Sequence, residues 1–121
     1  MILLLALLLV ANPPTADECA TAGKVAAYAC AKVSDGTPLT ELRQHVCSLT
    51  GRLAQSHCED GGMNIPEDAD ICSSSEVILT AIIRSSCVIV TKTKSELAIC
   101  VDWAKRAGAD YKAYCVEQNS I

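Results

Sequence analysis

The most restrictive feature of this sequence is the spacing of its eight cysteines. Cys19 and Cys30 are eleven positions apart, as are Cys47 and Cys58, and both segments fit the pattern C-x3-G-x2-A-x3-C. An α-helix turns by about 100° per residue, so eleven residues return to nearly the same face after three turns. The repeat therefore predicts two helices, each with its cysteines, glycine and alanine on one face.

An antiparallel pairing of these two helices brings together positions whose numbers sum to 77. Cys19 then pairs with Cys58, Cys30 pairs with Cys47, and Gly23 lies opposite Ala54 between the two bridges. A disulfide requires its two Cα atoms to lie within roughly 4.4 to 6.8 Å. Small residues between the bridges allow the backbones to come that close, so residues 17–58 are expected to form a doubly bridged helical hairpin.

The second half of the chain has its own symmetric spacing. Cys72 and Cys87 are fifteen positions apart, and so are Cys100 and Cys115. Antiparallel pairing on the sum 187 joins Cys72 to Cys115 and Cys87 to Cys100. Eight cysteines allow 105 connectivities, and the spacing favours this one without excluding the others.

These pairings predict an all-α fold, a disulfide-stapled bundle of about four helices arranged as two tandem antiparallel hairpins. The first helix is expected over about 17–33, and the second after Thr37 as N-cap, with Pro38 at its first position. Ser73 with Glu76 fits a capping box at the start of the third helix, and Thr93 begins the same motif before the fourth.

The segment expected to form the third helix carries conflicting signals. These residues, 75–90, are rich in β-branched side chains that favour a strand. Its length of sixteen residues and the cysteine geometry favour a helix, while strand within this segment stays open.

The first sixteen residues have the composition of a secretory signal peptide. An apolar run over 2–11 precedes Pro13 and Pro14, and Ala16 offers a small residue for cleavage, although no basic residue precedes the run. Ten apolar residues are too few to cross a bilayer, so no stable membrane insertion is expected. We therefore predict a secreted, extracellular protein with one domain over 17–121: hairpin 17–58, acidic linker 59–71 and hairpin 72–121.

Charge and residue usage argue against several functions. The chain has 10 basic and 14 acidic residues, a net charge of −4, which disfavours binding to nucleic acid. It has two histidines and no C-x2-C pair, so a zinc site is not expected. The linker acids do not fit the EF-hand pattern and are interpreted as a solvated segment; they are Glu59, Asp60, Glu67, Asp68 and Asp70. No cofactor is expected.

No plausible catalytic set is recognised either. His57 precedes two acids, but His45 lies twelve positions away on the same expected helix, too far along and around it for both to act on one bond. The sequence also lacks the G-x-S-x-G motif of serine hydrolases. We therefore do not expect an enzyme.

A possible partner-binding site lies on the first helix, on the face turned away from the bridges. Tyr28 lies there between Lys24 and Lys32, and an exposed aromatic side chain among lysines can anchor a partner. The leading hypothesis is a secreted, non-enzymatic binding protein, of the extracellular signal, toxin, defence or reproductive factor type, with an unknown extracellular protein partner. The alternative is a small carrier whose apolar ligand is held between the hairpins by the stripes over 39–53 and 77–83.

Overall fold

A computed structural model describes residues 15–61 and 70–119 of the chain. These residues form four helices and no strand: α2 (Ala16–Ser34), α3 (Thr40–Glu59), α4 (Ile71–Val90) and α5 (Lys94–Asn119). The prediction of an all-α bundle is confirmed, and the β-branched segment over 75–90 is helical throughout. The predicted signal peptide lies outside the described residues except for its last two positions, as does most of the predicted acidic linker.

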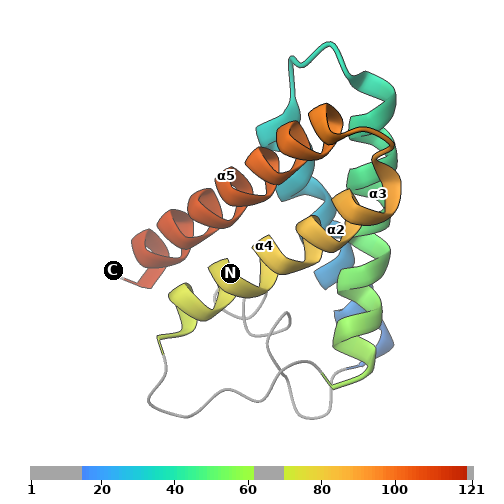
Figure 1. Cartoon of the computed structure of the whole chain (residues 1–121). Coiled ribbons are helices and arrows are strands. Elements are labelled where there is room, and N and C mark those ends of the chain that lie inside the picture. Colours follow the sequence, from blue (N-terminus) through green and yellow to red (C-terminus); the bar gives the residue numbers. More distant parts are fainter. Residues whose placement is uncertain (1–14, 62–69, 120–121) are drawn as a thin grey trace.

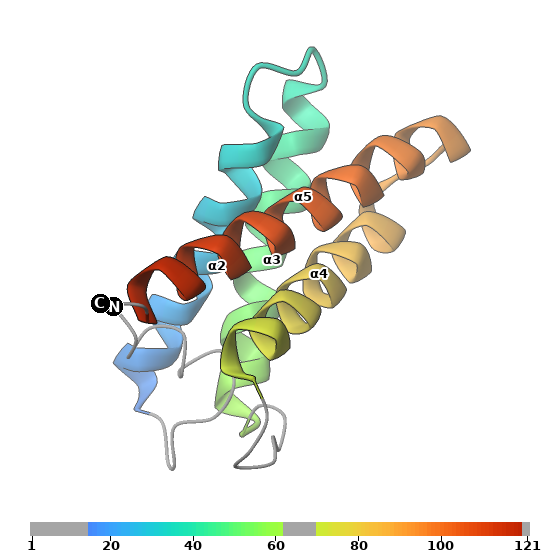
Figure 2. The same ribbon diagram turned by 90° about the vertical axis from the view of Figure 1, so that its left-hand side faces the viewer.

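Four disulfides join the helices in pairs, within each hairpin and not between hairpins. Their Cα–Cα distances run from 5.3 to 5.6 Å, and the pairs are the ones that the spacing predicts: Cys19–Cys58, Cys30–Cys47, Cys72–Cys115 and Cys87–Cys100. Figures 1 and 2 show α2 beside α3 and α4 beside α5, with the second pair crossing the first at an angle. The molecule is therefore two bridged hairpins packed on each other.

Two glycines come into close contact within the first hairpin, at a position that differs from the predicted register. A Cβ atom added to Gly23 would lie 2.7 Å from the carbonyl oxygen of Gly51, and one added to Gly51 would lie 3.1 Å from the carbonyl oxygen of Gly23. The two glycines thus face each other, and the prediction that Gly23 lies opposite Ala54 was wrong. The prediction counted equal numbers of residues from the bridges along both helices. In packed helices, however, the side-chain ridges of one helix fit into the grooves of the other, which shifts the contacting residues along the helix.

Two of the predicted helix starts were also wrong. Helix α3 begins at Thr40 with Leu39 as its N-cap, instead of at Pro38 after Thr37, and Leu39 makes no side-chain capping bond. Leu39 packs against the core, which fixes where the chain enters the helix. At α4 the cap is Asp70, not Ser73: its carboxylate accepts hydrogen bonds from the backbone N–H groups of residues 72 and 73.

The first and last helices begin with capping motifs. At α2, the hydroxyl of Thr15 accepts a hydrogen bond from the Glu18 N–H, and the Glu18 carboxylate accepts one from the Thr15 N–H. At α5, the predicted Thr93 accepts from the Glu96 N–H at 3.1 Å, while the Glu96 carboxylate reaches back to the N–H of residue 92. Each motif satisfies backbone donors that a helix start leaves free.

The core lies between the hairpins and consists of few large side chains. Trp103, Leu79, Ile83 and Val46 are fully buried, together with the bridged cysteines and several alanines. At the contact of α3 with α4, the Thr50 hydroxyl bonds to the Ser86 hydroxyl at 3.0 Å, so these buried polar groups are satisfied. Of the apolar stripe of α3, Val46 is fully buried, and Leu39, Leu42 and Leu53 are partly buried against the core.

Helix α4 is, among the described residues, the one helix long and apolar enough to cross a membrane. One side of it is buried in the core, including Ile78, Leu79, Ile82 and Ile83, and two disulfides join it to the polar helix α5. Its length and composition are therefore also those of a core helix.

Candidate functional site

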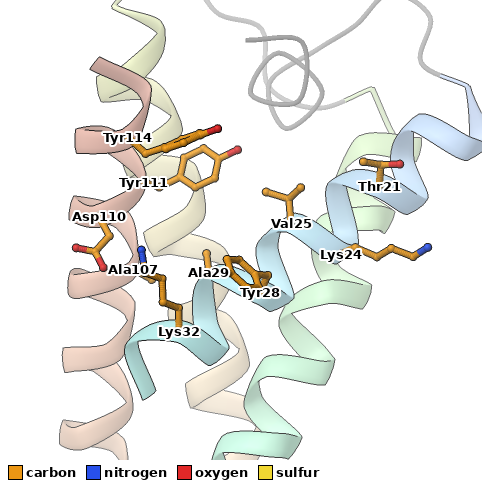
Figure 3. A pocket seen from close by; sticks show the side chains of 10 residues that line it. All are labelled: Thr21, Lys24, Val25, Tyr28, Ala29, Lys32, Ala107, Asp110, Tyr111 and Tyr114. Carbon is orange, nitrogen blue, oxygen red and sulfur yellow. The ribbon is translucent and has the colours of Figure 1, made fainter. Parts of the chain in front are cut away.

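The candidate site is a cleft of about 440 Å³ between α2 and α5, and hence between the two hairpins. Figure 3 shows the two helices diverging from the end where Lys32 lies, which opens the space between them. Its lining combines aliphatic, aromatic and charged side chains: Thr21, Lys24, Val25, Tyr28, Ala29 and Lys32 from α2, and Ala107, Asp110, Tyr111 and Tyr114 from α5.

Helix periodicity explains how α2 presents this lining. Thr21, Val25, Tyr28 and Lys32 follow one another at steps of four, three and four, so they share one face. That face is opposite the one with the cysteines, because position 28 lies about half a turn around the helix from position 30. The bridges thus hold α2 from one side and leave its other side free to form the cleft wall.

All three tyrosines of the chain line this cleft. Tyr28 is 70% exposed on the α2 side, whereas Tyr111 on α5 is only 9% exposed. The rings of Tyr111 and Tyr114 are 6.5 Å apart and tilted by 54°, and in Figure 3 both extend from α5 towards α2. Since the chain has no phenylalanine and one buried tryptophan, its accessible aromatic surface is concentrated here.

The phenol of Tyr111 stays protonated over a wide pH range. Its burial, with a smaller contribution from the phenol of Tyr114, raises the pKa of Tyr111 to about 12. A protonated phenol is both a hydrogen-bond donor and an acceptor. At neutral pH the α5 wall therefore offers a neutral aromatic ring with a hydroxyl group.

Three charged side chains border the cleft. Lys24 and Lys32 lie one turn before and one turn after Tyr28 on α2, and Asp110 lies on α5. In Figure 3, Lys32 reaches towards α5 and Asp110, while Lys24 extends away from α5. The lining has two positive charges and one negative charge, although the whole chain has a net charge of −4.

At the narrow end of the cleft, one arginine of α5 and one of α3 donate hydrogen bonds to the C-terminal turn of α2. Arg106 of α5 donates a hydrogen bond to the carbonyl oxygen of Val33, and Arg43 of α3 donates one to that of Ala31 at 3.0 Å. These carbonyls belong to the last turn, where a helix leaves acceptors unpaired and favours positive charge. Arg106 thereby fixes α5 against α2 across the boundary between the hairpins.

The structure brings the three residues predicted for partner binding, Lys24, Tyr28 and Lys32, to this one cleft. The α5 wall of the cleft was not predicted from the sequence. A signal was available there, because residues 107, 110, 111 and 114 have the spacing of one helix face and include two of only three tyrosines.

The other residues considered for function lie elsewhere. His45 borders a groove between α3 and α4 with Leu49 and Ile89, and His57 lies in the last turn of α3. Of the acidic cluster, residues 67 and 68 fall outside the described residues. Within the described ranges 15–61 and 70–119, no group of three or more potential metal ligands is found.

The apolar stripes proposed for a carrier do not line this cleft. Val46, Leu79 and Ile83 of those stripes are fully buried in the core. The space between the hairpins is instead open at the α2–α5 side, where three of the ten lining residues are tyrosines. Comparison of the chain with protein-family models, curated proteins and solved structures gives no significant match.

Proposed function

We propose that the protein is secreted and acts outside the cell by binding, with the tyrosine cleft as its binding site. The observation that carries this proposal is the gathering of all three tyrosines around one cleft in a chain that is 3% aromatic. Tyrosine combines a large apolar face with a polar hydroxyl and is enriched where proteins bind partners. Tyr28 is exposed at 70%, so an incoming molecule could reach it without unfolding any helix.

Two features support the proposed extracellular location, the disulfides and the N-terminal sequence. All eight cysteines are in disulfides, which form and persist in oxidising compartments such as the extracellular space. The apolar run over 2–11 fits a signal peptide. Because Thr15 caps α2, signal cleavage before Thr15 would preserve the cap, whereas the cut expected after Ala16 would remove it.

A binding role fits the cleft better than a catalytic one. Neither histidine borders the cleft, and the pKa of Tyr111 near 12 keeps its phenol from acting as a base at neutral pH. The remaining ionisable groups are Lys24, Lys32, Asp110 and the two other tyrosines. They are suited to contacting a partner through charge and hydrogen bonds.

Two kinds of partner are compatible with such a site. The exposure of Tyr28 favours a protein partner, as expected for an extracellular signal, toxin, defence or reproductive factor. The volume of about 440 Å³ favours the carrier alternative, because pockets for small molecules span roughly 300 to 1,000 Å³.

Site-directed photo-crosslinking tests the cleft even when the partner has not been identified. A photoreactive benzoylphenylalanine replaces Tyr28 in one variant and Val77, an exposed residue of α4, in the control. After irradiation in the extracellular fluid of the source, we expect a discrete adduct from position 28 that a Tyr111→Ala substitution weakens. Equal labelling at both positions, or no adduct at position 28, would contradict the proposal.

A further inference from the structure

We infer that the cleft takes an amphipathic anion, a small molecule with an apolar body and one negatively charged head group. This inference rests on the proposed function, and it specifies the chemistry of the ligand that the tyrosine cleft would hold. It follows from the arrangement of apolar walls and charged rims around a single space.

The apolar body would lie along the inner walls. Val25 and Ala29 on α2 face Ala107 on α5 across the cleft, and the rings of Tyr111 and Tyr114 extend over it. Small aliphatic side chains leave the space open, while the tyrosine rings offer broad apolar faces. Burial of apolar surface against such walls is favourable in proportion to the area removed from water.

The negative head group would lie at the lysines. Lys24 and Lys32 border the cleft on either side of Tyr28, and both have long flexible side chains with three donors each. The lining has two basic residues and one acidic residue, whereas the whole chain has 10 basic and 14 acidic residues, so the cleft is a place where an anion meets a favourable charge balance. The tyrosine hydroxyls can donate further hydrogen bonds to the same group.

A cationic ligand is the main rival that the residues suggest. Tyrosine faces attract cations, and Asp110 offers a negative charge. Lys32, however, reaches towards Asp110 in Figure 3 and opposes the approach of a second positive charge. Lys24 extends away from α5 in Figure 3, but it is an exposed, flexible side chain that can turn towards the cleft, and two lysines against one aspartate then favour the anion.

Three probes that share one alkyl chain separate these cases: octanoate, octanol and octylammonium. Each is titrated into the disulfide-intact protein, and binding is followed by nuclear magnetic resonance at the backbone signals of Val25, Ala29 and Ala107. We expect octanoate to bind most tightly at one saturable site, and its affinity to fall as salt is added.

Two double variants assign the head group. Lys24→Gln with Lys32→Gln should weaken octanoate binding roughly fivefold and leave octanol binding unchanged, because exposed ion pairs contribute modestly. Lys94→Gln with Lys105→Gln removes the same charge from exposed lysines outside the cleft and should change neither affinity. Tyr28→Ala should weaken all three probes.

The remaining outcomes would overturn the inference. Tightest binding of octylammonium would assign a cation site at Asp110, and equal affinities would show that charge does not select the ligand. If no probe shifts the backbone resonances of Val25, Ala29 and Ala107, the inference is overturned as well. In that last case a specific adduct at position 28 would still support the proposed function through a protein partner, so the two failures can be told apart.

Discussion

The contact between Gly23 and Gly51 gives a sharp test of how closely the first hairpin is packed. Replacement of Gly23 by alanine would place a Cβ atom 2.7 Å from the carbonyl oxygen of Gly51 and 3.2 Å from the Cβ atom of Gln55. The nearer atom belongs to the backbone of a helix, so it cannot rotate away. The disulfides on either side, with Cα–Cα distances of 5.3 and 5.4 Å, also prevent the helices from separating.

Two opposing effects determine the size of the change. Alanine is favoured over glycine within a helix by about 1 kcal/mol, which would stabilise the variant. Insertion of an extra carbon into a tightly packed contact costs about 1 to 3 kcal/mol, and the rigid surroundings at Gly23 favour the upper part of that range. We therefore expect Gly23→Ala to lower the free energy of unfolding by about 1 to 2 kcal/mol.

The assay is guanidinium unfolding followed by circular dichroism, with all disulfides intact. Gly51→Ala is the matched control, because its added Cβ atom would lie 3.1 Å from the nearest backbone atom and need only a small shift. Gly23→Ala should therefore destabilise the protein more than Gly51→Ala. An unchanged or raised stability in Gly23→Ala would refute the close approach of the two helices.

Three further predictions address other contacts. In the folded protein the pKa of Tyr111 is raised from 10.0 to about 12, so the free energy of unfolding should fall as the pH rises from about 10 towards 12. A spectrophotometric titration should show one tyrosine that ionises at higher pH than the others, and this step should be missing in Tyr111→Phe. Arg106→Ala should cost about 1 kcal/mol by removing the bond to the α2 terminus, while Lys105→Ala, its exposed neighbour, should be nearly neutral in the same unfolding assay. In protein that retains Thr15, Thr15→Ala should lower the free energy of unfolding by about 1 kcal/mol through loss of the α2 cap, and amide exchange in the first turn of α2 should accelerate. Unchanged exchange there would contradict the capping role.

The helical hairpins could be predicted because the relevant physics is local. The angle per residue of an α-helix converts the spacings of eleven and fifteen into shared faces, and disulfide geometry then selects antiparallel partners. The residues at which the helices begin were harder to predict from the sequence. Thr37 and Ser73 have good capping side chains, yet packing of Leu39 and the nearby carboxylate of Asp70 determine where α3 and α4 begin.

The cleft could be predicted only in part, because it depends on how one hairpin lies on the other. The α2 side was accessible from periodicity, since Tyr28 must face away from the bridges. Its pairing with Tyr111 and Tyr114 requires the crossing of α2 and α5, which no spacing in the sequence specifies. The aromatic composition was the remaining sequence signal for the cleft. The chain has only three tyrosines, so their gathering at one place points to a binding site.

The central claim is that the chain folds as two separately bridged hairpins, and cleavage at Met63 tests it most directly. Apart from Met1, this is the only methionine, and it lies between Cys58 and Cys72, so cyanogen bromide cuts the chain between the hairpins. Without reductant, mass spectrometry should find two separate fragments, ending at Met63 and beginning at residue 64, each with four cysteines in two bridges. Fragments that stay joined until a reductant is added would contradict the account, because at least one disulfide would then connect the hairpins.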